Sequence, residues 1–230
     1  MKSTFNLLAA LLFLIPQSAG AQDEVRKAGF FRIVNAVAPG TGNLFIKING
    51  RELHEKGYRE AQYSGGIGIG AGDHEITVEK AGVRSGTTRF QVEPGETLSL
   101  VAFAVRLEPD GDAEDGEPPP WGIRILRLKQ QQVETGYRVS FVSVCEPEEL
   151  GVQAAIHGRN EPAVVTLKRL DMRSVDLGER RLKVVVRHHG KKIAEVSPDS
   201  PGNYVVILYQ DSGGEVRALS FHDPKFVIAG

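Results

Sequence analysis

The sequence predicts an all-β protein made of two tandem antiparallel β-sandwiches that follow an export signal. Apolar and polar residues alternate with period two in almost every patterned segment, as Ile76 and Val78 do between charged and hydroxyl neighbours. Such alternation is typical of strands with one buried face. Turn residues separate these segments at short intervals, which favours a sandwich over β-α-β units. The order of segments occurs twice, so we expect two domains of one immunoglobulin-like or prealbumin-like fold.

The repeat is clearest at one glycine-containing stretch. Ile67–Val78 and Val175–Val184 each combine an alternating run, a glycine and a second alternating run, which predicts a β-hairpin in each half. Gly178 follows Gly72 by 178 − 72 = 106 positions, and neighbouring apolar pairs keep this separation. We interpret the pattern as a tandem duplication with its seam near Gln130–Thr135.

In the first half, Phe31–Val37 and Leu44–Ile48 are expected as the first two strands. The pair Asn49-Gly50 follows, and these residue types tolerate the positive φ angles of a tight type I′ turn. Lys56–Gln62 is weakly patterned, and the sequence leaves open whether it is a loop or an edge strand.

The remaining strands of the first half are expected at Ile67–Lys80, Thr87–Val92, Leu98–Val105 and Trp121–Leu128. The turn Glu93–Glu96 contains Pro-Gly and separates two of them. Leu98–Val105 is almost continuously apolar, which indicates a strand at the middle of a sheet.

The second half repeats this order. Expected strands lie at Tyr137–Val139, Val152–Ile156, Val175–Val184, Val205–Tyr209 and Val216–Leu219. The last of these follows its counterpart Ile123–Leu126 by only 216 − 123 = 93 positions, so the first half carries an insertion around Glu108–Pro120. We therefore divide the chain into a leader at residues 1–21, a first domain at 29–129 and a second at 136–230.

The first 21 residues have the features of a cleaved signal peptide. Lys2 is followed by the apolar run Leu7–Ile15 and by the small residues Ala19–Ala21. The apolar run is too short to cross a bilayer, and no later stretch is apolar enough to do so. We expect an exported protein, periplasmic or secreted, with no transmembrane segment in the mature chain.

Net charge argues against a nucleic-acid partner. Without Lys2, the mature chain has 28 − 1 = 27 basic and 29 acidic residues, and therefore a net charge of −2. Nucleic-acid-binding domains usually carry a basic excess.

Three short motifs carry a resemblance to a known family. Phe31–Ala36, Ile46–Gly50 and Ala71–Ile76 resemble the sequences R-V-V-H-A, V-x-V-N-G and P-A-G-x-Y-x-V of the bacterial domain-of-unknown-function family DUF4397. The resemblance covers about Phe30–Val105, with a fainter copy in Tyr137–Tyr209.

The chain departs from the family pattern at three places. Asn35 replaces the usual His, Gly70 replaces the usual Pro, and His74 or Glu75 lies where an aromatic residue is usual. The resemblance implies an exported or cell-surface sandwich without an established catalytic residue. The overall plan is also similar to that of accessory proteins of periplasmic alginate O-acetylation, which implies an adaptor in exopolysaccharide modification.

The sequence identifies no catalytic residue, cofactor site or metal site. Cys145 ends an apolar strand and has no second cysteine to pair with, so we expect a buried, unreactive thiol. His188 and His189 are expected in a strand or at the turn before Gly190. Neighbouring side chains of a strand point to opposite faces, so the pair is not expected to bind one metal ion. The acidic stretch Glu108–Glu117 does not fit the spacing of an EF-hand, although a looser calcium site stays open.

Two charged segments are the candidate binding surfaces. Six cations form the first one, and three of them alternate with apolar residues, so they would share one exposed sheet face: Arg180, Arg181, Lys183, Arg187, Lys191 and Lys192. The alternative is a charged edge strand that prevents sheet-to-sheet aggregation. The second segment is a possible acidic docking loop with Asp110, Asp112, Glu114 and Asp115.

These features favour a non-catalytic exported binding, adaptor or structural protein of the bacterial envelope, with a role in exopolysaccharide assembly or modification. The expected partner is another envelope protein or an acidic polysaccharide. The alternative is a carbohydrate-binding module, which would need exposed aromatic residues; the candidates are Trp121, Tyr58, Tyr63 and Phe221. An enzyme would need a cluster of polar groups that the sequence does not show.

Overall fold

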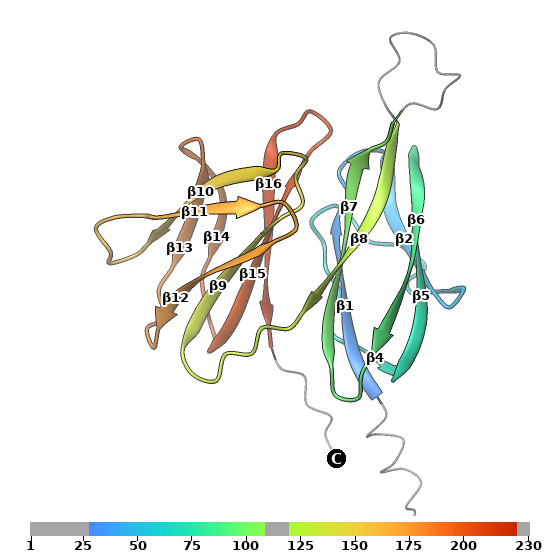
Figure 1. Ribbon diagram of the computed structural model, residues 1–230, viewed down its shortest axis with the longest axis horizontal. Coiled ribbons are helices and arrows are strands. Elements are labelled where there is room, and N and C mark those ends of the chain that lie inside the picture. Colours follow the sequence, from blue (N-terminus) through green and yellow to red (C-terminus); the bar gives the residue numbers. More distant parts are fainter. Residues whose placement is uncertain (1–27, 109–119, 225–230) are drawn as a thin grey trace, which may run out of the picture.

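The computed structural model describes residues 28–108 and 120–224, and within them it is all-β, as predicted. In this described part of the chain, sixteen strands form two sandwiches that lie side by side (Figure 1). The predicted signal peptide and the acidic residues Asp110, Asp112, Glu114 and Asp115 lie outside the described residues.

The first sandwich contains eight strands in two layers: β1 (Ala28–Ala36), β2 (Thr41–Ile48), β3 (Arg51–Glu52), β4 (Ile67–Gly70), β5 (Gly72–Ala81), β6 (Val83–Val92), β7 (Thr97–Arg106) and β8 (Trp121–Lys129). One layer has the order β3-β2-β5-β6 and the other β8-β7-β1-β4, and a single pairing of Arg84 with Gly122 joins β6 to β8. Strands β1 and β7 pair in parallel.

The second sandwich repeats this arrangement with β9 (Tyr137–Ser143), β10 (Glu149–Ile156), β11 (Ala163–Lys168), β12 (Met172–Gly178), β13 (Val184–His188), β14 (Lys191–Val196), β15 (Gly202–Gln210) and β16 (Val216–Asp223). Its layers have the orders β11-β10-β13-β14 and β16-β15-β9-β12, which match those of the first sandwich strand for strand. The central pair β9–β15 is again parallel.

The hairpin predicted at Ile67–Val78 is wrong. Strand β4 pairs with β1 in one layer, whereas β5 pairs with β2 and β6 in the other. The corresponding strands β12 and β13 are also in different layers. Gly72, at φ 129°, turns the chain from one sheet to the other. Two strands joined by a corner between sheets show the same alternation of apolar and polar residues as two strands of a hairpin, and both connections favour glycine. Periodicity alone therefore does not tell a corner from a hairpin.

The turn predicted at Asn49-Gly50 is confirmed. Both residues have positive φ angles, 49° and 77°, and Ile48 pairs with Arg51 across the turn. These angles are those of a type I′ hairpin, whose twist matches that of the strands it joins.

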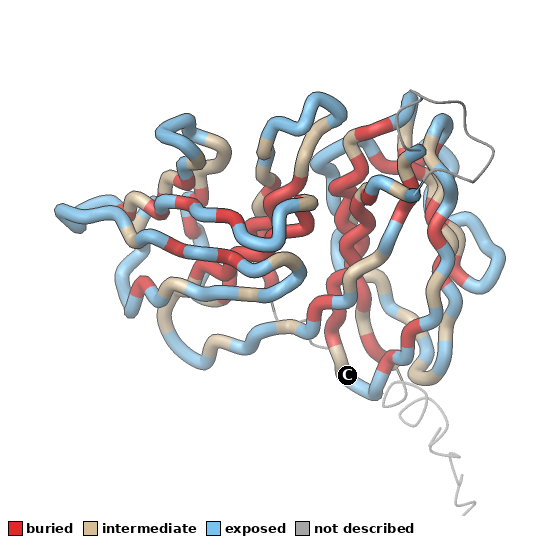
Figure 2. The backbone as a smooth tube through the Cα atoms, turned by 45° about the horizontal axis from the view of Figure 1, so that its top comes forward, coloured by how far each residue is buried: buried red, intermediate tan, exposed pale blue. Residues whose placement is uncertain are grey.

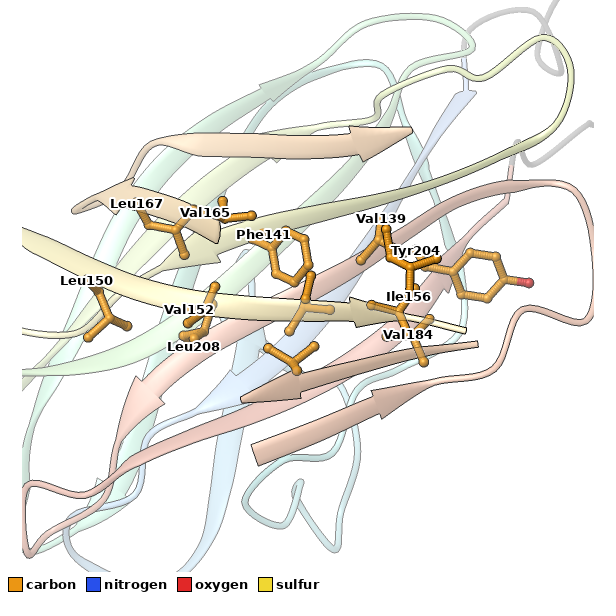
Figure 3. Close-up of a cluster of buried hydrophobic side chains, with 14 of the residues drawn as sticks. Val139, Phe141, Leu150, Val152, Ile156, Val165, Leu167, Val184, Tyr204 and Leu208 are labelled. Carbon is orange, nitrogen blue, oxygen red and sulfur yellow. The ribbon is translucent and has the colours of Figure 1, made fainter. Parts of the chain in front are cut away.

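Each sandwich has its own apolar core. Phe31, Leu44 and Ile76 are among the buried residues of the first core. The second core surrounds Phe141 and includes Leu167 and Leu208 (Figure 3). Each of these residues comes from a different strand of its sandwich, and its side chain points inward between the two layers.

A third apolar layer joins the two sandwiches. Val34, Val101 and Phe103 of the first pack in one cluster with residues of the second such as Val205 and Ile207. Figure 2 shows runs of buried positions along the strands where the two sandwiches meet. Strands β1, β7 and β15 are therefore buried on both faces.

None of the described residues forms a helix of the length and apolarity that a membrane span requires.

Candidate functional site

The predicted cation cluster lies on the outer sheet of the second sandwich. Lys183, just before β13, and Arg187, within it, are exposed, whereas the intervening Val184 and Val186 are buried in the core. Successive side chains of a strand point to opposite faces, so Lys183 and Arg187 share the solvent face with half-buried Val185. Lys192 of β14 is the register partner of Arg187. We name the exposed side of β13 and β14 with Lys183, Arg187 and Lys192 the basic face.

The edge-strand alternative is wrong for β13. This strand has β10 on one side and β14 on the other, so it is an inner strand of its sheet. The edge is β14, which carries Lys191 and Lys192. Protection of a sheet edge against aggregation can therefore explain Lys191 and Lys192. It does not explain Lys183 and Arg187.

Carboxylates neutralise part of the cluster. Glu195 forms ion pairs with Lys183 and Lys192, each at 2.5 Å. Hydrogen bonds from these two lysines hold the pKa of the Glu195 carboxyl below its usual range. Lys191 pairs with Glu215 at 2.8 Å. Within the described residues, the basic face thus contains three cations and the single paired carboxylate Glu195.

The three arginines of the cluster have no carboxylate partner among the described residues. Arg187 donates a hydrogen bond to the main-chain oxygen of Gly190 at 3.0 Å, and Arg181 donates one to that of Pro198. Such bonds orient a guanidinium but leave its charge uncompensated. Arg187 also lies opposite Lys192, and like charges on directly opposed strand positions repel each other.

A groove of about 680 Å³ lies beside the basic face, at the open end of the second sandwich. Leu150, Ile193 and Val216 give it an apolar floor, and its rim includes His188 and His189. The two imidazole rings are 4.1 Å apart, centre to centre, and His189 has a positive φ of 48°. His188 is the last residue of β13 and His189 lies in the turn before Gly190, one of the two positions that the sequence left open, so the two side chains are not held on opposite faces of a strand.

The described residues contain no group of three or more His, Cys, Asp or Glu side chains placed to hold a metal ion. His188 Nδ1 lies 2.9 Å from the main-chain oxygen of Gly151. A carbonyl oxygen can only accept, so Nδ1 carries the proton and donates, and Nε2 is left for other partners.

Cys145 is buried, as expected. Burial raises the pKa of its thiol to about 11, which keeps it protonated at neutral pH. Only the thiolate is an effective nucleophile, so this residue is unreactive in the folded protein.

The aromatic candidates for sugar stacking are mostly covered. Tyr58 and Phe221 are buried in the apolar clusters. The guanidinium carbon of Arg106 lies 4.7 Å from the ring centre of Trp121 and covers part of that ring. Tyr63 is 43% exposed but leans on Phe221, with ring centres 5.4 Å apart. The four residues therefore do not form a common platform.

The structure also brings together three arginines that the sequence does not group. Arg106, Arg124 and Arg169 line a cleft of about 540 Å³ at the junction of the two sandwiches. They come from the end of β7, from β8 and from the turn after β11, and Glu146 lies among them. We name this site the arginine cleft. No periodicity or motif links residues so far apart in the chain.

No protein-family model and no curated protein matches this chain.

Proposed function

We propose that this chain is a non-catalytic exported binding protein of the bacterial envelope, and that its basic face holds an acidic polysaccharide. The observation that carries the proposal is the placement of Lys183, Arg187 and Lys192 on one exposed sheet face with the single carboxylate Glu195 among them. Export is expected from the N-terminal sequence alone.

The shape of the face fits an extended polymer. The face lies on a four-stranded sheet, and the positions beside Arg187 and Val185 on β10 are occupied by Gln153 and Ala155. These short or uncharged side chains leave the row of cations accessible. Carboxylates of a polymer would separate Arg187 from Lys192 and relieve their repulsion.

The experiment compares binding of polygalacturonate to the wild-type chain and to the double variant Arg187→Gln/Lys192→Gln by isothermal titration calorimetry. We expect the double variant to bind roughly tenfold more weakly at low salt, because two charge-assisted contacts are lost. Binding of the wild type should also weaken as salt is added, since exposed charges are screened.

The matched control is Arg51→Gln/Lys56→Gln, which removes one exposed arginine and one exposed lysine from the first sandwich. This control should bind like the wild type. Equal loss in both double variants would show that net charge alone drives binding, and salt-independent binding would contradict the proposal. Binding to an acidic peptide but not to the polymer would assign the face to a protein partner instead.

A further inference from the structure

We propose that the arginine cleft is a second binding site, which takes a small oxyanionic ligand, a phosphate monoester or a carboxylate of monosaccharide size. This inference does not rest on the basic face. The two sites use different residues, and the cleft lies between the sandwiches rather than on one outer sheet.

The arginine cleft has a positive net charge. Three guanidiniums and one carboxylate line the cleft, a net charge of 3 − 1 = +2. Arg106 Nε lies 3.4 Å from Glu146 Oε1. Arg124 and Arg169 form no ion pair within the part of the chain that the structure describes. Two of the three guanidiniums are therefore available to an anion.

Arg169 has a hydrogen-bond donor without a partner among the described residues. Its Nε is buried and has no hydrogen-bond partner among the described residues. A buried N–H group without a partner is unfavourable, and such groups in native structures often mark a site for a ligand or a water molecule. The Arg169 guanidinium therefore has hydrogen-bonding capacity that no described residue uses.

The turn that carries Arg169 is held in a strained conformation. Leu170 has a φ of 65°, a region that residues other than glycine rarely adopt, and its side chain is 42% exposed. The amide of Arg169 donates to the oxygen of Glu148 and that of Leu170 to the oxygen of Ser143, both at 2.8 Å. Strain that the surroundings hold in place is common at binding sites, where it fixes a side chain in advance.

Part of the cleft lining is apolar. Phe103 and Val105 line the cleft and belong to the apolar layer between the sandwiches. An apolar floor lowers the local dielectric constant and strengthens each charge interaction. A volume of about 540 Å³ suits a small molecule. Planar guanidiniums bind carboxylate and phosphate with two parallel hydrogen bonds, which an ammonium cannot do.

The test uses the full mature chain and three probes: inorganic phosphate, glucose 1-phosphate and galacturonate. Calorimetry measures the affinity of each for the wild type and for Arg124→Ala/Arg169→Ala. We expect at least one probe to bind, and the double variant to bind it at least about tenfold more weakly, because charge-assisted bonds are lost. A preference for the phosphates or for galacturonate identifies the source of the oxyanion.

Two controls keep the test decisive. Arg173→Ala removes an exposed arginine of β12 outside the cleft and should leave the affinity unchanged. Amide shifts in wild-type NMR spectra do not depend on any variant, and on titration they should move at Phe103–Arg106 and at Arg169–Leu170. Absence of binding by all three probes, equal affinity of the double variant, or shifts confined to other residues would overturn the proposal. The basic-face variants should bind the probes normally, so each proposal can fail alone.

Discussion

The buried pair Arg32–Asp223 connects the two sandwiches at the level of single residues. Arg32 of β1 lies 3.5 Å from the carboxylate of Asp223 at the end of β16, and both side chains are almost fully buried. The guanidinium also lies 4.7 Å from the ring centre of Phe221. Gln130, between the sandwiches, donates to the main-chain oxygen of Asp223 at 3.3 Å. Two opposite charges are thus removed from water where the sandwiches meet.

The Arg32–Asp223 pair should make the free energy of unfolding depend on pH. Burial raises the pKa of the Asp223 carboxyl above its ordinary value, although Arg32 opposes this shift. A raised pKa means that the folded state holds the proton more tightly than the unfolded state. The contribution of Asp223 to the free energy of unfolding should therefore be complete below about pH 3.9 and should decrease as pH rises through the folded-state pKa.

NMR titration of the Asp223 carboxyl measures this pKa directly, and urea unfolding at several pH values measures the free energy. The variant Asp223→Asn should lose this part of the pH dependence. An Asp223 that titrates below about 3.9 would show that attraction to Arg32 outweighs burial, and would contradict the prediction.

At the same scale, the two candidate sites differ in how far the sequence predicts them. Lys183 and Arg187 lie on alternate positions near one strand, so their common face follows from period two. Arg106, Arg124 and Arg169 meet only because β7, β8 and the turn after β11 converge at the junction of the sandwiches. That convergence depends on domain packing, which no local pattern encodes.

At the scale of elements, the glycine corners decide which sheet each strand joins. Gly72 lies between β4 and β5 with a φ of 129°, and Gly178 ends β12 with a φ of 69°. A side chain at Gly72 would have open space around it, so the cost of a substitution there comes from the backbone angle and not from a clash.

We therefore predict that Gly72→Ala lowers the free energy of unfolding by about 1 kcal/mol, because alanine rarely adopts a positive φ. Gly70→Ala is the matched control. Gly70 also has open space around it and does not have a positive φ, so its replacement should be neutral or slightly stabilising. Urea unfolding measures both. Equal effects at the two positions would contradict the assignment of Gly72 to a strained corner.

The strands themselves could be predicted, but their partners could not. Alternation located Ile76 and Val78 on the buried face of β5, and the structure agrees. The same alternation would exist whether β4 paired with β5 or with β1. Pairing is decided by contacts between residues far apart in sequence, such as Phe31 with Ile67.

At the scale of the whole molecule, the two sandwiches share an apolar layer. Leu98, Leu100 and Ala102 of β7 face the first core, whereas Val101 and Phe103 face the second sandwich. This two-sided burial explains why Leu98–Val105 is almost continuously apolar. The sequence predicted the buried strand, but it did not indicate that a second domain covers its outer face. With this layer in place, the sandwiches are expected to move and unfold as one body.

Differential scanning calorimetry of the wild type and of Ile207→Ala tests that claim most directly. Ile207 is fully buried in the shared layer, and its truncation should cost about 3 kcal/mol through lost burial and a cavity. We predict one cooperative transition for the wild type, with equal calorimetric and van't Hoff enthalpies, which moves as a whole to lower temperature in the variant. Two separate transitions in the wild type, or a variant in which only one half melts earlier, would contradict the account.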